Sequence, residues 1–265
     1  MKSKPLLNGL ITAATTPFAR NGDIDTGALT SHLQWLRESG ADQILLGGTT
    51  GEFFSLTIEE RIGLLRVAAK TEPVHLMFHA GANVLADTLH LVRAAETEGA
   101  HSVAVILPYF LAGAPQDGII SYLRQLAEAT ELPFLIYNFP KHTQVRVTPE
   151  LLQQIPHFGL KDSAADLSLI AHTPRYYIGS DRLLRTAYEK GAAGFISARS
   201  NAHPRLYATM DMVARGHVHG DADALHNEVL RVCDALSGPN QIRLVKEAVQ
   251  QSLPGYPSAV RLPLT

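Results

Sequence analysis

The sequence predicts a TIM barrel, an α/β fold of the (β/α)8 type, with a short C-terminal helical extension. Eight short apolar segments alternate with eight helical patterns, and glycines and prolines mark the joins between them. A barrel of this type needs about 250 residues, and the chain has 265. Short joins in an uninterrupted alternation favour a closed parallel barrel over an open, doubly wound sheet.

The first four strand and helix units occupy the N-terminal half of the chain. Apolar, often β-branched runs predict strands at residues 8–15, 43–47, 74–79 and 102–107. The spacing of apolar residues predicts helices at 25–39, 57–70, 84–98 and 116–130. Thr57 and Glu60 have the spacing of a capping box, which supports a helix start at that point.

The remaining units repeat the pattern and are followed by the extension. The expected strands are residues 133–137, 158–161, 175–179 and 194–197. One helix is expected to begin at Thr148, and three more are expected at residues 166–172, 182–190 and 204–215. Two more helical patterns, 222–236 and 241–253, precede an extended tail. We therefore expect a catalytic barrel at residues 1–216 and a helical appendage at 217–265, packed on the barrel or on another subunit.

Composition narrows the class of partner. Lys and Arg number 23 against 25 Asp and Glu, a net charge of -2, and the basic residues are scattered, so neither nucleic acid nor an anionic membrane is an expected partner. A small-molecule substrate is the expected one. The single cysteine, Cys233, excludes an internal disulfide, and the first residues lack the apolar segment of a signal peptide. These features predict a cytoplasmic protein.

Lys161 is the residue on which a functional interpretation depends. It follows the run Phe158-Gly159-Leu160, and a helix-starting sequence follows it, so its amine is expected at the carboxyl end of a strand, where function collects in TIM barrels. An amine partly desolvated by Phe158 and Leu160 would lose its proton more easily than one in water, as a Schiff-base lysine requires. The alternative is an ordinary strand-end lysine in water.

Other polar residues follow the predicted strands. Residues 47–53, Gly-Gly-Thr-Thr-Gly-Glu-Phe, form a glycine-rich turn whose free N–H groups and two hydroxyls could hold a small carboxylate, or it is a plain tight loop. Tyr109 and Tyr137 follow strands four and five and could pass a proton, or they are amphipathic core residues. Asp181 follows Gly179-Ser180, where helix capping is the simpler role.

The twelve histidines raise the question of a metal site. His75 and His79 lie on one strand face, but the spacing of four residues separates them by about 13 Å, too far to share one ion. His142 and His203 lie near strand ends, where surface or satisfied core roles are the simpler interpretation. The sequence predicts no metal site.

In combination, these motifs resemble the dihydrodipicolinate synthase / N-acetylneuraminate lyase family of class I aldolases, from residue 9 to about 263. The motifs are Gly48-Thr49-Thr50-Gly51-Glu52, Pro108-Tyr109, Tyr137-Asn138-Phe139-Pro140 and Gly159-Leu160-Lys161-Asp162. The resemblance implies that Lys161 forms an imine with pyruvate or a 2-keto acid and that no separate cofactor is needed.

The resemblance also implies roles for the other candidates. Thr49 and Thr50 would hold the carboxylate, Thr49 would also take part in the reaction, and Gly48 in the same loop would help to bind the substrate. Tyr137 would be the acid and base, and Tyr109 a second catalytic tyrosine. The substrate contacts would be completed by the backbone carbonyl of Ile196 and, around the hydroxylated tail, by Gly179, Ser180 and Asp181.

Two departures from the family pattern narrow the substrate. Family members that make dihydrodipicolinate have a second tyrosine where this chain has Phe110 and an arginine where it has His142. The sequence is more similar to the branch that acts on 2-keto-3-deoxy sugar acids such as 2-keto-3-deoxygluconate. Residues 111–116 contain neither Arg nor Lys, which favours unphosphorylated substrates.

Alternative functions remain open from the sequence. A dehydratase of a deoxy-keto sugar acid would use the same lysine and tyrosine, dihydrodipicolinate synthase is a further alternative, and a 2-keto acid binding protein would keep the barrel without turnover. Family members usually continue past a segment like Arg261-Leu262-Pro263 into a last helix that this sequence lacks. We expect a homo-oligomer, either a dimer or a tetramer.

Overall fold

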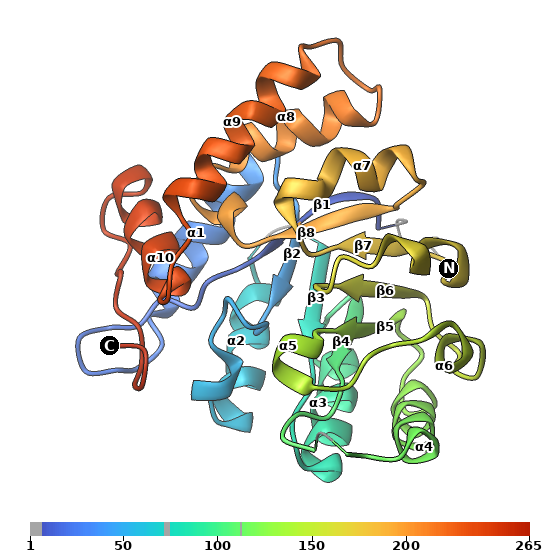
Figure 1. The fold of residues 1–265 in the computed structure, drawn as a ribbon. Helices are drawn as coiled ribbons and strands as arrows, with labels where there is room; N and C mark the ends of the chain where they lie inside the picture. The colour runs from blue at the N-terminus through green and yellow to red at the C-terminus, as the bar shows by residue number, and fades with distance from the viewer. Residues whose placement is uncertain (1–6, 72–74, 112) are drawn as a thin grey trace.

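The computed structural model describes residues 7–71, 75–111 and 113–265 and shows a closed barrel. Each strand runs parallel to the next one along the chain, and β8 pairs with β1 to close the ring, with helices around it (Figure 1). The strands are β1 (Gly9–Ala13), β2 (Gln43–Leu46), β3 (His75–His79), β4 (Ser102–Ile106), β5 (Phe134–Asn138), β6 (Gly159–Asp162), β7 (Tyr176–Ile178) and β8 (Gly194–Ser197). The predicted fold class is confirmed; Val74, the expected start of the third strand, lies outside the described residues.

The outer helices largely follow the predicted ranges. They are α1 (Thr26–Glu38), α2 (Ile58–Ala69), α3 (Leu85–Thr97), α4 (Gln116–Ala127), α6 (Pro149–Gln153), α7 (Leu184–Glu189) and α8 (Pro204–Ala214). The capping box of Thr57 and Glu60 is present at the start of α2. The short helix α5 (Pro140–Thr143), which begins directly after β5 with proline in its first turn, was not expected from the sequence.

Two predicted helices differ from the observed ones. Residues Leu167–His172 form a 3₁₀ helix in place of an α-helix, because the Asp166 carboxylate accepts a hydrogen bond from the N–H of Ser168, only two residues on, which favours a tighter turn. The helix predicted at 182–190 begins as a separate 3₁₀ turn, Asp181–Leu183, before α7. Both changes lie in the short connections that surround the carboxyl ends of β6 and β7.

The core has two layers because alternate residues of a strand face opposite sides of the sheet. Inside the barrel, Ile11, Leu45, Met77 and Leu135 pack together. The larger outer layer lies between the strands and the helices, and all strands contribute buried residues to the core. Such packing holds the strand ends in a fixed frame, from which polar side chains project at the carboxyl edge.

The C-terminal extension packs against the barrel. It consists of α9 (Ala222–Ala235), α10 (Gln241–Ser252) and the tail that follows. Val229 and Cys233 of α9 join the outer core, whereas Val245 and Val249 of α10 form a small core of their own with Tyr256 of the tail. The extension is thus fixed to the barrel by apolar contacts, and its separation from the barrel at residue 216 stays a prediction.

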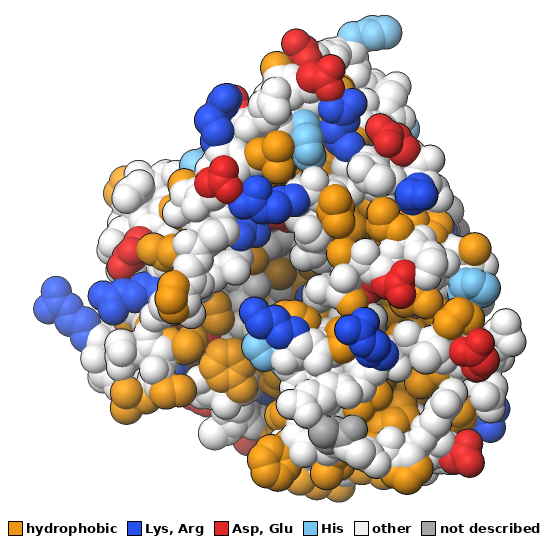
Figure 2. All heavy atoms as spheres, viewed as in Figure 1, with side chains coloured by type: hydrophobic (Ala, Val, Ile, Leu, Met, Phe, Trp, Pro, Cys, Tyr) orange, Lys and Arg blue, Asp and Glu red, His pale blue; other side chains and the backbone are white. Residues whose placement is uncertain are grey.

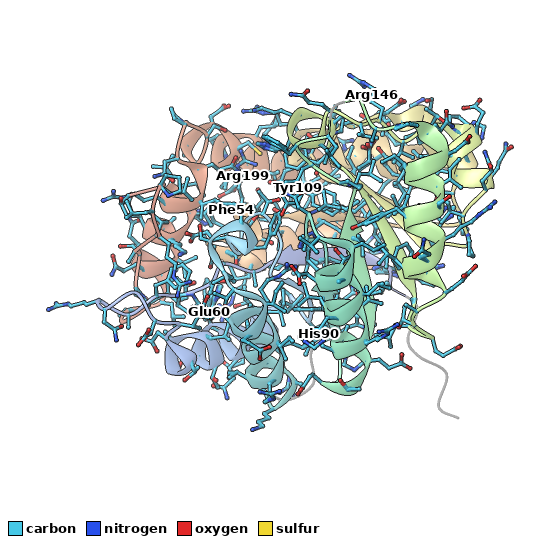
Figure 3. The ribbon with its side chains drawn as sticks, turned by 90° about the horizontal axis from the view of Figure 1, so that it is seen from below. Phe54, Glu60, His90, Tyr109, Arg146 and Arg199 are labelled. Atoms are coloured by element: carbon cyan, nitrogen blue, oxygen red, sulfur yellow. The ribbon has the colours of Figure 1, made fainter. Side chains whose placement is uncertain are left out.

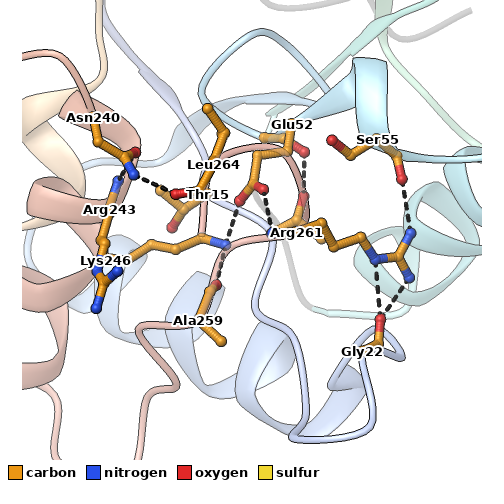
Figure 4. Close-up of polar contacts among 12 residues, drawn as sticks. Thr15, Gly22, Glu52, Ser55, Asn240, Arg243, Lys246, Ala259, Arg261 and Leu264 are labelled. Atoms are coloured by element: carbon orange, nitrogen blue, oxygen red, sulfur yellow. Dashed lines mark hydrogen bonds and ion pairs between the residues drawn. The ribbon is translucent and has the colours of Figure 1, made fainter.

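A buried ion pair joins the extension to the loop after β2. The Lys246 ammonium donates to Glu52 Oε1 (2.5 Å) and to the Ala259 carbonyl (2.7 Å), and the backbone N–H of Arg261 donates to Glu52 Oε2 (3.0 Å; Figure 4). The side chains of Lys246 and Glu52 have no exposed surface. Glu52 adopts a left-handed conformation with φ of 57°. The loop that contains Thr49 and Thr50 is therefore tied to α10 and the tail.

The lengths of the helices bear on the predicted cytoplasmic location. Within the described residues, no helix has both the length and the apolar character needed to cross a membrane. The cytoplasmic location stays a prediction.

Candidate active site

A cavity of about 200 Å³ opens at the carboxyl ends of the strands. Figure 2 shows this face of the molecule hollowed near its centre, with Lys and Arg side chains on more than one side of the hollow. Residues predicted from the sequence line the cavity, namely Thr49, Thr50, Tyr137, Lys161, Gly179, Asp181 and Ile196. These residues come from five strand ends, as expected from the rule that functional residues of TIM barrels lie at this end of the barrel.

Lys161 and Tyr137 are neighbours on adjacent strands. They are direct register partners on β6 and β5, and the Lys161 Nζ lies 3.7 Å from the centroid of the Tyr137 ring. Both side chains are almost completely buried, at 5% and 2% exposure. The Tyr137 hydroxyl lies 3.3 Å from Thr49 Oγ1. The amine thus lies over the face of the tyrosine ring, and the phenol is within hydrogen-bond distance of the threonine hydroxyl; all three side chains line the cavity.

The neighbour of Lys161 on its own strand fixes the strand end. Asp162 is fully buried, and its carboxylate accepts hydrogen bonds from Asn138 Nδ2 (2.8 Å), from the Tyr176 hydroxyl (2.8 Å) and from two backbone N–H groups of the following turn. These bonds link β5, β6 and β7. Because successive residues of a strand point to opposite faces, Asp162 anchors the outer side while Lys161 faces the cavity.

The loop after β2 presents the two threonines to the cavity. Gly47 has a φ of +61°, and a Cβ on Gly51 would approach the Ala14 carbonyl oxygen to 3.0 Å, so the loop needs glycine at these positions. Among the described residues, the backbone N–H groups of Thr49 and Thr50 donate to no other group of the protein. They are available, together with the Thr50 hydroxyl, to bind a carboxylate.

His79 and Arg61 support this loop from below. The Gly47 carbonyl lies 2.9 Å from His79 Nδ1 and accepts a hydrogen bond from it, and Arg61 donates to the carbonyls of His79 (2.5 Å) and Gly81 (2.9 Å). Burial, together with the charges of Arg61 and Lys161, holds the pKa of His79 well below its ordinary value. A neutral imidazole therefore positions the loop, a role that the sequence did not reveal.

Asp181 forms an ion pair with Arg199, a residue that was not predicted as part of the site. Its Oδ2 accepts from the Arg199 guanidinium (3.2 Å) and from the Tyr207 hydroxyl (3.1 Å), and Arg199 also lines the cavity. Burial raises the pKa of Asp181, and the charge of Arg199 opposes this effect. The capping role considered for Asp181 is wrong, because Ser180 occupies the cap position and Asp181 is the first residue of the 3₁₀ turn.

Comparison with known proteins identifies the family. The sequence matches the model of the dihydrodipicolinate synthetase family over residues 6–265. The chain belongs to this family. A 4-hydroxy-tetrahydrodipicolinate synthase of Mycolicibacterium paratuberculosis is 34% identical over 257 residues, covering 92% of this chain and 85% of that protein. An uncharacterized DapA-like lyase of Chloroflexus aurantiacus is 32% identical, with 97% and 90% covered.

A solved structure supports the same conclusion. YagE, a prophage protein of the dihydrodipicolinic acid synthase family from E. coli K12 in complex with pyruvate, superposes with a TM-score of 0.89 at 26% identity and covers 98% of this chain and 93% of its own. Enzymes of the dihydrodipicolinate synthetase family are pyruvate-dependent class I lyases that use a Schiff base on lysine and no metal cofactor. The predictions of the family and of an enzyme are confirmed.

Not every predicted residue of this family member lines the cavity. Tyr109, Gly48 and Ser180 are absent from its lining. Tyr109 packs against the cluster that contains Tyr137, its ring 5.9 Å from that of Phe53, while Gly48 precedes the two threonines and Ser180 precedes the 3₁₀ turn. Leu160, expected beside the Lys161 amine, packs in the outer core instead. The alternation of side chains along a strand explains this error, and the aromatic group beside the amine is Tyr137.

Three polar residues of the cavity lining were not predicted as site residues. Ser163 follows β6 by one residue, and Arg199 follows β8 by two, so the strand-end rule could have indicated both. Gln241 comes from the first turn of α10, for which the barrel pattern gives no signal. Within the described residues, no group of His, Cys, Asp and Glu side chains has the arrangement of a metal site.

Proposed function

We propose that this protein is a class I aldolase that reversibly cleaves a 2-keto-3-deoxy sugar acid, such as 2-keto-3-deoxygluconate, to pyruvate and an aldehyde. The observation that carries the proposal is the grouping of Lys161, Tyr137 and Thr49 in the cavity lining, with the amine over the tyrosine ring and the phenol against the threonine hydroxyl. Thr50 and the free N–H groups of its loop are placed to hold the substrate carboxylate.

Imine formation begins the reaction. The unprotonated Lys161 amine adds to the C2 carbonyl carbon, and the resulting carbinolamine loses its hydroxyl as water when Tyr137 supplies a proton. The product is a protonated imine, with Tyr137 left as a phenolate. The buried setting of both side chains keeps bulk water away from this exchange.

Carbon–carbon cleavage uses the same two residues. The Tyr137 phenolate takes the proton of the C4 hydroxyl, the C3–C4 bond breaks, and its electron pair moves into the imine to give an enamine and a free aldehyde. Protonation at C3 and addition of water then release pyruvate and restore the Lys161 amine. The imine acts as an electron sink, which avoids a bare carbanion, and Thr49 holds the phenol in place.

The first test is covalent trapping of the imine. The protein is incubated with pyruvate and sodium borohydride, and its intact mass is measured for the wild type, Lys161→Ala and Lys141→Ala. We expect an adduct on the wild type and on Lys141→Ala, whose lysine is exposed and lies outside the cavity lining, but not on Lys161→Ala. If none of the three proteins carries an adduct, the proposed mechanism is wrong and a 2-keto acid binding protein becomes the better interpretation.

Product analysis separates the aldolase from a dehydratase. Both reactions begin with the same imine, but only the aldolase releases pyruvate from a 2-keto-3-deoxy sugar acid. Pyruvate is measured with a coupled dehydrogenase and the remaining keto acid by mass spectrometry. Loss of water without release of pyruvate would show that the protein is a dehydratase.

Synthesis of 4-hydroxy-tetrahydrodipicolinate is the second candidate, because the relative from Mycolicibacterium paratuberculosis carries that name. Two features of this chain argue against it. Phe110 cannot relay a proton, and it is 93% exposed on the surface. His142 is also exposed and does not line the cavity. Condensation of pyruvate with aspartate semialdehyde, compared with glyceraldehyde, decides between the two candidates.

The surface near Tyr109 favours a homo-oligomer. Phe54, Phe110 and Leu111 expose 46%, 93% and 54% of their surface, and Phe110 is held in a left-handed conformation with φ of 76°. Figure 3 shows Phe54 and Tyr109 on the same side of the molecule, and the Phe53 ring lies 5.7 Å from that of Phe54 and 5.9 Å from that of Tyr109. Exposed aromatic residues of this kind mark association surfaces. Light scattering after size exclusion is expected to give at least a dimer.

A further inference from the structure

The cavity extends beyond the residues that would hold pyruvate. Lys161 on β6 and the threonine loop after β2 lie on opposite sides of the eight-stranded ring and enclose the reacting end of the substrate. The rest of the wall comes from the ends of β7 and β8 and from α10, where Arg199 and Gln241 are the polar residues not yet assigned a role. In Figure 3, Arg199 lies on the same side of the molecule as Tyr109, whereas His90 lies on the opposite side.

Arg199 has more donors than partners. A guanidinium carries five N–H groups. In the described part of the chain, one bond goes from Arg199 to Asp181 Oδ2 (3.2 Å) and one to Ser237 Oγ (3.0 Å), and Nε has no partner although it is buried. Three N–H groups therefore remain on a side chain that is only 15% exposed and lines the cavity. Donors held in this way call for oxygen acceptors on a ligand.

Asp181 explains how Arg199 is held. The carboxylate is 4% exposed and is itself fixed by the Tyr207 hydroxyl at 3.1 Å. One terminal nitrogen of the guanidinium donates to Asp181 and the other to Ser237, which leaves the remaining donors unused. Asp181 thus acts as a positioning residue for Arg199.

Gln241 is the second unused polar group. It is the first residue of α10, is partly buried, and its side-chain amide makes no hydrogen bond within the part of the chain that the structure describes. A primary amide offers both donors and an acceptor, so it can bind a hydroxyl in either direction. Lys246, one and a half turns further along α10, is locked to Glu52, which fixes the position of the helix at the cavity.

Charge balance indicates the kind of group that Arg199 and Gln241 bind. The charged residues that line the cavity are Lys161, Asp181 and Arg199. Asp181 offsets Arg199, and the carboxylate of a bound keto acid offsets the protonated imine on Lys161. A further negative charge on the substrate tail would be left without a compensating cation, which is costly in a site of low solvent access.

From these observations we propose that Arg199 and Gln241 form the specificity subsite of the enzyme, which binds the hydroxyl groups of an uncharged, polyhydroxylated tail on the aldehyde part of the substrate. This inference rests on the proposed aldolase function. The C-terminal extension then contributes directly to substrate choice through Gln241.

The test compares three aldehydes in condensation with pyruvate. Glyceraldehyde is hydroxylated and neutral, propanal has the same number of carbons without hydroxyls, and succinic semialdehyde carries a carboxylate. The kcat/KM for each aldehyde is measured for the wild type, Arg199→Met and Gln241→Leu, with borohydride trapping of pyruvate as a control on the imine step. We expect each variant to lose about 10- to 100-fold with glyceraldehyde, the effect of removing one or two hydrogen bonds to a hydroxylated tail, and to change little with propanal.

Each outcome bears on the inference. Equal losses with glyceraldehyde and propanal would show that Arg199 only supports the fold through Asp181. If Arg199→Met does not fold, the same comparison is made with Gln241→Leu, which removes no hydrogen bond of the protein. A preference of the wild type for succinic semialdehyde that disappears in Arg199→Met would show an anion site instead. If pyruvate is trapped but the aldehydes are not discriminated, only this inference fails. If pyruvate is not trapped at all, the proposed function fails with it.

Discussion

The buried pair of Lys246 and Glu52 offers the sharpest test of how the extension supports the site. Lys246→Met keeps most of the apolar stem of the lysine but removes the ammonium, and it leaves Glu52 buried without its cation. Burial lowers the pKa of Lys246, and Glu52 raises it in part, so the pair already carries a desolvation cost. Loss of one member is therefore more harmful than the net stability of the pair would suggest.

The size of the effect follows from the complete burial of both side chains. Breaking a buried ion pair by removing one partner costs about 3–5 kcal/mol. In a chain of this length such a loss lowers the melting temperature by roughly 6–20 °C. The matched control is Arg243→Met on the same helix, whose pair with Glu247 is about half exposed (53% and 43%) and is expected to contribute less than about 1 kcal/mol.

Thermal and urea denaturation at one fixed protein concentration measure the effect, because association with a second subunit would otherwise shift the transition. The double variant Glu52→Gln with Lys246→Met should recover at least half of the lost stability, since it removes the unpaired charge and keeps an oxygen for the Arg261 N–H. If Lys246→Met is as stable as Arg243→Met, or the double variant is less stable than the single one, the reasoning is refuted.

Two further predictions concern the chemistry and the pH dependence of stability. Tyr137→Phe should lower kcat by about 10²- to 10⁴-fold while the pyruvate adduct still forms slowly, as measured by steady-state kinetics and by the time course of trapping; an unchanged kcat would assign the proton transfer to another group. Burial lowers the pKa of His32 to about 4, whereas a histidine in the unfolded chain titrates near 6.5. The contribution of the neutral His32 to the free energy of unfolding is therefore fully present above pH 6.5 and falls by roughly 3 kcal/mol as the pH drops toward 4. His32→Phe should make the urea midpoint less sensitive to pH in this window, whereas His90→Gln, a change at an exposed residue, should leave the slope unaltered.

The chemistry at the cavity floor could be predicted because it depends on local sequence. Lys161 and Tyr137 each lie one residue before the end of a short strand, and in a parallel barrel all such ends meet at one edge, so their proximity follows from the fold class. The position predicted for Leu160, beside the amine, is wrong. The same alternation that directs Lys161 inward sends its neighbour outward to the helices.

Gln241, one of the two residues of the proposed specificity subsite, could not be predicted in the same way, because its place at the cavity depends on how α10 docks. An amphipathic pattern shows which face of a helix is buried, but not which surface that face meets. The docking is decided by pairs far apart in sequence, such as Lys246 with Glu52, 194 residues away, and by the small core around Val245 and Tyr256. Glu52 lies two residues after Thr50, and Lys246 lies five residues after Gln241. Their ion pair therefore fixes the distance between the loop that would hold the carboxylate and Gln241, which we propose to bind the substrate tail. We therefore expect substrate length to be coupled to the stability of the C-terminal extension. A variant that loosens this pair should lose discrimination between aldehydes before it loses the imine.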